Sequence, residues 1–385
     1  MADHTEHAPA PRTVLVAGAT GYIGGRLVPE LLEAGHRVRC MARTPAKLRD
    51  RPWSDRVEVV AGDVFDPDSL AEAFDGVDVV TYLVHSMDGE GDFRERDRRA
   101  AEDAGVEQIV YLGGLGREDD DLSEHLRSRH EVGRVLADGP VPVTELRAAV
   151  IIGSGSASFE MLRNLTEVLP VMVTPKWVAT RCQPIAVRDV LAYLVGVVGR
   201  EEARDRILEV GGPDVLTYED MMHLYADVAG LRRRRIVNVP LLTPGLSSRW
   251  IGLVTPLPVG LARPLVDSLV NEVVVTDDAI RSIVPRQPLP MREAFGLALR
   301  RIQDVDVTTT WAGADLPESV TGRPRTRLDA AEPDPSDPDW SGGTVLSDDQ
   351  SIPTSASPDA VFDVLEGLGG TRGWYSPSWL WRLRG

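Results

Sequence analysis

The sequence predicts an α/β protein whose main domain is a doubly wound parallel sheet, with a small substrate-side subdomain attached. Apolar runs of strand length alternate with helical patterns from Thr13 to Ile152, as expected of consecutive βαβ units. Closely spaced glycines lie between the first strand and the first helix. After Gly153 the predicted elements change in pattern, as expected of segments that cover a substrate cleft.

The glycines carry the strongest functional indication. Gly18, Gly21 and Gly24 follow the buried strand Val14–Ala17 and precede a helix that ends near Gly35. A glycine has no side chain to keep a pyrophosphate from the free N–H groups at a helix N-terminus, where the helix dipole also favours anions. We therefore expect a Rossmann-type domain that binds a dinucleotide, with a tight turn that binds nothing as the alternative.

The end of the second predicted strand, Arg37–Met41, indicates which dinucleotide is bound. An NAD enzyme usually has an acidic residue there for the ribose hydroxyls, whereas an arginine accommodates the 2′-phosphate of NADP. This chain has Arg43 in that place, with Arg39 and Lys47 nearby. We expect NADP(H) to be preferred over NAD(H); an ordinary solvated arginine is the alternative.

The rest of the predicted sheet follows from short apolar runs that end at turn residues. Asp66 followed by a proline is typical of a helix start. The charged segment GDFRERDRRAAEDAG is just long enough for a right-handed crossover. The predicted elements are a strand at 57–60, a helix from Asp66 to Phe74, a strand at 77–84, the charged helix, a strand at 108–112, a helix at 123–136 and a strand at 143–152.

The substrate-side part is predicted from helix caps and shorter apolar runs. Thr217 is followed three residues later by Asp220, which is typical of a helix start. The segment 241–270, rich in Leu, Val and Pro, predicts a hydrophobic lid or pocket wall, or a partner-binding surface. The predicted elements are a helix at 156–169, a strand at 183–187, a helix at 188–198, a strand at 206–210, a helix from Thr217 to Val228 and a closing helix at 291–302.

The G-x-x-G-x-x-G spacing and the phrase ATGYIGGRLVPELL, followed by MARTP, resemble the extended and atypical short-chain dehydrogenase/reductase superfamily. The NmrA-like, NAD(P)-binding branch is the most similar. The segments PIAVRDVLAYL and LEVGGPDVLTYEDMM resemble its substrate-side parts, and the resemblance implies that Asp63 reaches the adenine. The cofactor site implied in this way consists of Gly18, Thr20, Gly21, Tyr22, Ile23, Gly24, Arg43, Asp63, Val64, Leu83, Val84 and Arg129.

Reductases of this superfamily usually use a Tyr-x-x-x-Lys pair, in which the tyrosine transfers the proton and the lysine lowers its pKa. The chain has only two lysines, Lys47 and Lys176. Arg43 and Met172 stand four residues before them, so the pair is absent from the sequence.

Two histidines remain as candidate catalytic residues. On the helix at 122–137, His125 lies near the family's tyrosine position and Arg129 near its lysine position. Arg129 can hold ribose or phosphate but cannot carry a proton. His125 can act as a general acid near neutral pH, and His85 follows the fourth strand, whose carboxyl end faces the cofactor. A histidine without a catalytic role is the alternative for each.

Composition excludes several other functions. The net charge of −17 argues against general binding to nucleic acid or anionic membranes, and we favour a solvated strand edge over a nucleic-acid patch for Arg232–Arg235. No apolar stretch reaches membrane-spanning length. The two cysteines show no metal-ligand spacing, so we expect no metal site and a reducing cytoplasm. Self-association is left open.

The predicted organisation is a disordered tail at 1–10, an NAD(P)-binding domain at 11–305, a Pro-rich linker at 306–340 and a C-terminal module at 341–385. That module resembles the first strand and helix of a helix-grip, polyketide-cyclase-like fold, and it ends before such a sheet could close. Two functions fit this organisation. One is an oxidoreductase acting on a hydrophobic carbonyl or quinone-like substrate, and the other is a non-catalytic NADP(H)-sensing protein.

Overall fold

The computed structural model describes residues 10–64, 66–84, 93–117, 122–238 and 267–303, together with Thr309 and short pieces at 356–358 and 360–362. Several predicted features lie outside the described residues. They are His85, nearly all of the N-terminal tail, most of the apolar segment 241–270, and nearly all of the predicted linker and C-terminal module.

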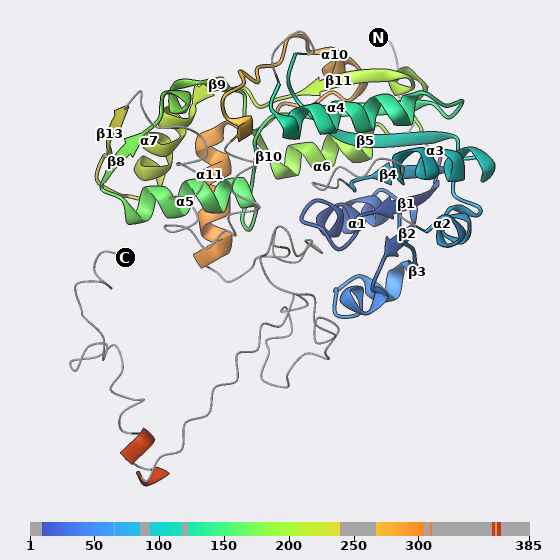
Figure 1. The fold of residues 1–385 in the computed structure, drawn as a ribbon, viewed down its shortest axis with the longest axis horizontal. Coiled ribbons are helices and arrows are strands. Elements are labelled where there is room, and N and C mark those ends of the chain that lie inside the picture. Colours follow the sequence, from blue (N-terminus) through green and yellow to red (C-terminus); the bar gives the residue numbers. More distant parts are fainter. Residues whose placement is uncertain are drawn as a thin grey trace, which may run out of the picture.

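The centre of the molecule is a sheet of seven strands in the order β11-β6-β5-β4-β1-β2-β3, all paired in parallel (Figure 1). The order changes direction between β1 and β4, which is where ligands bind in open parallel sheets. The doubly wound parallel sheet predicted from the sequence is thus confirmed. The strands are β1 (Thr13–Ala17), β2 (Arg37–Ala42), β3 (Glu58–Ala61), β4 (Val79–Tyr82), β5 (Gln108–Gly114), β6 (Val143–Ala148) and β11 (Arg206–Val210).

Helices cover both faces of this sheet. Val16 of β1 is buried on the face with α1 and α6, and Leu15 on the face with α2, α3 and α4. Successive residues of β1 thus face helices on opposite sides of the sheet. A strand covered on both sides has no solvent-facing position, so its sequence is an unbroken apolar run. The helices are α1 (Gly24–Glu33), α2 (Pro67–Phe74), α3 (Phe93–Asp103), α4 (Glu124–Ala137) and α6 (Val187–Gly196), with 3-10 turns η1 (Pro45–Leu48), η2 (Ser54–Arg56) and η4 (Glu201–Ala203).

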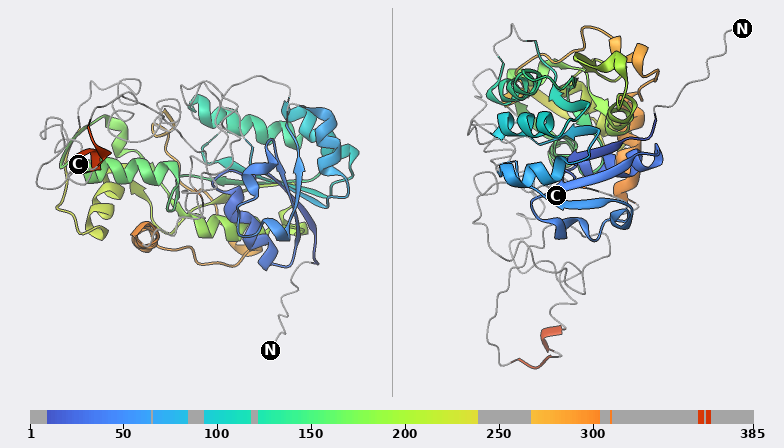
Figure 2. Two further views of the ribbon diagram at one scale, coloured as in Figure 1. Left: turned by 90° about the horizontal axis from the view of Figure 1, so that it is seen from below. Right: turned by 90° about the vertical axis from the view of Figure 1, so that its right-hand side faces the viewer.

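A smaller group of elements lies at the end of the molecule away from β2 and β3 (Figures 1 and 2). The chain enters it from the carboxyl ends of β6 and β11. The rings of Phe159, Tyr225 and Phe295 pack at its centre, with centroids 5.7 to 6.1 Å apart. Its elements are β7 (Ile151–Ile152), α5 (Ala157–Val168), β8 (Val171–Thr174), η3 (Lys176–Ala179), β9 (Arg181–Cys182), β10 (Ile185–Ala186), β12 (Leu216–Thr217), α7 (Tyr218–Val228), β13 (Arg235–Asn238) and α11 (Met291–Gln303), and α10 (Ala279–Ile283) packs beside β11.

The predicted helix start at Thr217 is confirmed in detail. The Asp220 amide donates to Oγ1 of Thr217, and the Thr217 amide donates to Oδ2 of Asp220, both at 3.0 Å. Two amides that an isolated helix would leave without partners are therefore satisfied. Asp66 likewise caps α2 by accepting from the Asp68 amide at 3.2 Å.

Three predicted strands are wrong in extent. The strand predicted at 143–152 is β6, which ends at Ala148, and the separate β7, which pairs with β10 outside the main sheet. The apolar run continues because Ala149 and Val150, between the two strands, are partly buried against the core of the smaller group. The strand predicted at 183–187 shrinks to β10, because α6 already begins at Val187. The strand predicted at 77–84 keeps only its middle, β4.

Cys40 and Cys182 are both buried free thiols. Burial raises the pKa of each thiol to about 12, so both stay protonated. In the part of the chain that the structure describes, no group of His, Cys, Asp and Glu side chains is placed to hold a metal ion, and no helix is both long and apolar enough to span a membrane.

Candidate functional site

The glycine loop between β1 and α1 has the geometry that a pyrophosphate needs. Gly18 adopts a φ of +101°, which L side chains rarely adopt, and a Cβ on it would lie 3.3 Å from Cβ of Leu83. A Cβ on Gly21 would lie 3.2 Å from the Gly18 carbonyl oxygen. A Cβ on Gly24 would overlap that same oxygen, so Gly24 lets α1 lie close to the end of β1, as predicted.

The N-terminus of α1 lacks a side-chain cap among the described residues. Ile23 is its N-cap residue, and Thr20 and Tyr22 precede it in the loop. The first turn of α1 has no acidic residue. The first N–H groups of a helix carry a partial positive charge, so they suit a phosphate. The loop therefore fits the pyrophosphate of a dinucleotide.

Arg43 follows β2 directly and is exposed, which is the position that the sequence predicts for a 2′-phosphate ligand. Arg39 is not available for that role. Its guanidinium donates to Glu58 at 2.7 Å and to the backbone carbonyls of Ala73 and Asp75 at 3.0 and 2.6 Å. Arg39 therefore ties β2 to β3 and to the end of α2.

Four more of the predicted cofactor residues lie at the carboxyl ends of β3 and β4. Asp63 is held in a turn, with its amide donating to Oγ of Ser69 at 3.0 Å, and Val64 beside it is buried. Leu83 follows β4, with its amide donating to the Ala17 carbonyl at 3.0 Å, and Val84 comes next. The structure thus brings the loop, Asp63 and the end of β4 to one edge of the sheet, as the chain order of a parallel sheet requires.

A buried carboxyl group below this edge was not found from the sequence. Asp97 on α3 is 2% exposed, and the Tyr82 hydroxyl donates to its Oδ2 at 2.6 Å. Burial raises the pKa of Asp97 to about 8 despite that hydrogen bond, and Asp63 adds to the rise. Nothing in the charged segment that forms α3 distinguishes Asp97 from its solvated neighbours.

On α4, His125 and Arg129 lie one turn apart and contact each other. Nε of Arg129 donates to Nε2 of His125 at 3.4 Å, and Nη1 donates to the Leu112 carbonyl at 3.3 Å. Burial, together with the positive charge of Arg129, lowers the pKa of His125 to about 3. His125 is therefore neutral near pH 7, which argues against its predicted role as an imidazolium acid.

A buried ion pair on β6 is a second feature that the sequence analysis missed. Nε of Arg147 lies 2.9 Å from Oε1 of Glu145, and both side chains are less than 10% exposed. Gly113 of β5 and Gly133 of α4 make room for the carboxylate, because a Cβ on either would collide with it. Opposite charges two residues apart lie on the same face of a strand, and this spacing is the signal that indicates such a pair.

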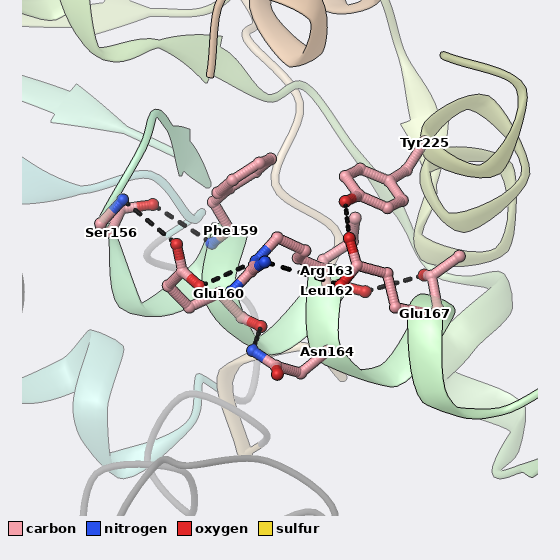
Figure 3. Close-up of polar contacts among 10 residues, drawn as sticks. Ser156, Phe159, Glu160, Leu162, Arg163, Asn164, Glu167 and Tyr225 are labelled. Carbon is pink, nitrogen blue, oxygen red and sulfur yellow. Dashed lines mark hydrogen bonds and ion pairs between the residues drawn. The ribbon is translucent and has the colours of Figure 1, made fainter. Parts of the chain in front are cut away.

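Helix α5, in the smaller group of elements, carries a chain of polar contacts (Figure 3). Arg163 lies between two carboxylates, with Nε 3.0 Å from Glu160 and Nη1 3.5 Å from Glu167. The Tyr225 hydroxyl on α7 donates to Glu167 at 2.5 Å, and burial with this contact raises the pKa of Tyr225. These contacts fasten α7 to α5 and make Tyr225 a poor proton donor.

The glycine loop reaches the start of this subdomain. The Tyr22 hydroxyl packs against Gly153, so closely that a Cβ on Gly153 would lie only 2.5 Å from the hydroxyl oxygen. Burial raises the pKa of Tyr22 to about 12. Nη2 of Arg26 donates to the Ser154 carbonyl at 2.8 Å. The glycine loop and the first residues of the smaller group of elements are thus in direct contact.

A parallel sheet with a glycine loop and an uncapped helix N-terminus at its switch point is typical of α/β proteins that bind dinucleotides. Residues 18–150 match the NAD(P)H-binding family, so this part of the chain is an NAD(P)H-binding domain. The chain has the fold of the atypical short-chain dehydrogenase/reductases, as its resemblance to the NmrA-like branch implied.

The similar proteins include several reductases. The chain is 28% identical over 258 residues to the divinyl chlorophyllide a 8-vinyl-reductase of Oryza sativa, a match that covers 61% of this chain and 62% of that relative. It is 27% identical over 333 residues to the ceramide reductase of Caulobacter vibrioides, covering 80% and 97%. The NADPH complex of an Escherichia coli quinone oxidoreductase matches with a TM-score of 0.60 and 20% identity, covering 73% of this chain and 98% of that one.

Proposed function

We propose that the protein is an NADP(H)-dependent oxidoreductase that reduces a hydrophobic carbonyl or quinone-like acceptor. The contact between the glycine loop and the start of the substrate side carries this proposal. Tyr22 packs under Gly153, and Arg26 holds the Ser154 carbonyl. A protein that only binds a dinucleotide does not need a second group of elements joined to the cofactor loop in this way.

The names of similar proteins support the choice of acceptor. They are reductases named for a chlorophyllide, a ceramide and a quinone, all of which are large and largely apolar molecules. A conjugated acceptor of this kind takes a hydride at one atom and a proton from solvent at another. We expect the reaction in the cytoplasm, where thiols such as Cys40 and Cys182 stay reduced.

In this reaction the chain's own residues bind and orient the cofactor and do not transfer a proton. A bound reduced nicotinamide supplies the hydride. The glycine loop holds the pyrophosphate, Arg43 holds the 2′-phosphate, and Arg129 provides a fixed cation beside the end of β5. Water supplies the proton, because His125 is neutral and the tyrosine and lysine of the usual pair are absent.

The test is NADPH oxidation with a panel of quinones and long-chain aldehydes, run beside a direct measurement of NADPH affinity. We expect turnover of at least one quinone. Gly21→Val is the matched control, since it removes the cofactor site but not the substrate side. Turnover that persists in Gly21→Val would contradict the proposal.

A second function, NADP(H) sensing without turnover, is favoured by one observation. Neither a Tyr-x-x-x-Lys pair nor a protonated His125 is present to act as an acid. Tight NADPH binding with no oxidation in the presence of any acceptor of the panel would establish the sensing role instead.

A further inference from the structure

Thr309 lies against the glycine loop although it is more than 280 residues away along the chain. Its hydroxyl donates to the Tyr22 carbonyl at 3.0 Å and accepts a hydrogen bond from Nε of Arg26 at 2.8 Å. Nη2 of Arg26 also donates to the Thr309 carbonyl at 3.2 Å. Thr309 is 3% exposed and Arg26 is 8% exposed, so the loss of either partner would leave buried polar groups unsatisfied.

The Tyr22 carbonyl accepts no backbone hydrogen bond from the first turn of α1, whereas the carbonyls of Gly21 and Ile23 on either side of it do. In a regular helix the amide of Arg26 would donate to this carbonyl, four residues before it. Here that amide donates to the Ile23 carbonyl instead, at 3.1 Å. The Thr309 hydroxyl therefore supplies the donor for Tyr22 at the junction between the glycine loop and the helix.

Gly25 makes room for this contact. A Cβ on Gly25 would lie 2.8 Å from Cγ2 of Thr309 and 3.3 Å from the Ala19 carbonyl. Gly25 does not belong to the three-glycine spacing, and the sequence gives it no role of its own. The space that a side chain on Gly25 would fill is taken by the methyl group of Thr309.

Arg26 extends the contact toward the substrate side. Its guanidinium lies 4.8 Å from the centre of the Tyr22 ring and donates to the Ser154 carbonyl at 2.8 Å. Thr309, Arg26 and Tyr22 thus form one buried unit behind the open end of α1.

We infer that Thr309 is a positioning residue of the cofactor site. Together with Arg26 it fixes the Tyr22 carbonyl, and this holds the glycine loop in the conformation that receives the pyrophosphate. NAD(P)H binding by residues 18–150 is shown by the family match, so this role holds whether or not an acceptor is reduced.

The first test compares two ligands by titration calorimetry on the full chain. Thr309→Val removes both hydrogen bonds of the hydroxyl at nearly constant volume, and NADPH affinity is expected to fall about tenfold, as for one or two lost hydrogen bonds. Adenosine 2′-monophosphate has neither the pyrophosphate nor the nicotinamide, so its affinity should change by less than about twofold, within the scatter of neutral substitutions. Thr309→Ser keeps the hydroxyl and should bind NADPH as the wild type does.

Wild-type NADPH affinity in Thr309→Val, or an equal loss for both ligands, would overturn the assignment. An equal loss would indicate a general disturbance of the fold.

The second test uses Gly25 and needs NADPH alone. Gly25→Ala forces a methyl group against Cγ2 of Thr309, and NADPH affinity should fall. The double variant Gly25→Ala/Thr309→Ser has no Cγ2 and should recover to within about threefold of the wild type, since the two changes are directly coupled. No recovery would show that Gly25 acts through Ala19, and its pairing with Thr309 would be wrong.

Discussion

Arg129 donates a hydrogen bond from Nε to Nε2 of His125, one helical turn earlier on α4. The arginine thereby occupies the nitrogen that an acid would need to hold a proton, and burial lowers the pKa of His125 to about 3. The two residues that the sequence analysis puts near the tyrosine and lysine positions of the usual pair therefore contact each other directly. This pair decides what the chemical tests should show.

His125→Ala should lower any reductase rate by less than about tenfold, below the range of about 10²–10⁴ that a true general acid contributes. The pH profile of kcat/KM should also lack a limb from this group between pH 5 and 8, because its pKa lies near 3. Steady-state rates with one accepted substrate check both points. His223→Ala on α7 is the matched control, and His85→Ala belongs in the same assay.

A thousandfold loss in His125→Ala, with NADPH affinity unchanged, would establish His125 as the acid. The same loss in His85→Ala would assign the acid to a residue that lies outside the described part of the chain.

Arg43→Asp should reverse the cofactor preference. The wild type is expected to favour NADP(H) over NAD(H) by about 1–3 kcal/mol, the range for charge-assisted hydrogen bonds to a phosphate. Calorimetric titration of both cofactors measures the ratio of affinities. Arg49→Asp, an exposed arginine a few residues further on, makes the same change in net charge and should keep the ratio. Equal wild-type affinities would contradict the role of Arg43.

Gly21→Val should abolish NADPH binding, because its side chain would fill the space that the pyrophosphate needs. The fold should stay largely intact, because among the described residues a Cβ at this position would meet only the Gly18 carbonyl oxygen, at 3.2 Å. Gly24→Ala should behave differently, since its Cβ overlaps the backbone of Gly18 and must displace α1. Thermal unfolding with and without NADPH separates the two results. Gly296→Ala, whose Cβ would meet open space, is the control for adding a methyl group.

We expect Gly21→Val to keep its unfolding temperature but lose the shift caused by NADPH, and Gly24→Ala to unfold at a lower temperature without any ligand. Unchanged NADPH affinity in Gly21→Val would show that the loop is only a structural turn.

Asp97→Asn should make the protein more stable at pH 8 than the wild type. The pKa of Asp97 is raised from 3.8 to about 8 in the folded state, so the unfolded chain releases this proton at lower pH. The free energy of unfolding of the wild type therefore falls as the pH rises from about 4 to about 8, by an amount on the order of 5 kcal/mol at most. The Asn side chain keeps a hydrogen-bond acceptor for Tyr82 and does not titrate.

Urea unfolding at pH 5 and pH 8 measures this difference. Asp103→Asn, at the exposed end of the same helix, should show the same pH dependence as the wild type. If Asp97→Asn and the wild type lose stability in parallel between the two pH values, Asp97 is ionised in the native protein and the prediction is wrong.

The sheet could be predicted from the sequence because its signals are local. The apolar run of β1, the three glycines and the cap of α7 each lie within a few residues, and the 206–210 strand has the predicted bounds. The predicted limits failed where burial continues past the end of a strand, as at Ala148. A run of apolar residues reports burial and not hydrogen-bond pairing.

The missed parts of the candidate site depend on contacts between distant residues. In the sequence Asp97 cannot be told from the other acidic residues of a charged helix, and only the folded chain shows its hydrogen bond with Tyr82. Thr309 lies in a polar stretch, and only the folded chain brings it to Tyr22. The low pKa of His125 could not be foreseen for a related reason, because it depends on how deeply α4 is buried against β5.

The two cysteines give the protein a practical property. Cys40 and Cys182 are buried and hold their protons, whereas thiol reagents such as maleimides attack an accessible thiolate. A single cysteine introduced on the surface would therefore be modified selectively on the folded chain without removal of the native ones. A fluorescent dye attached in this way can report the arrival of a nucleotide in real time.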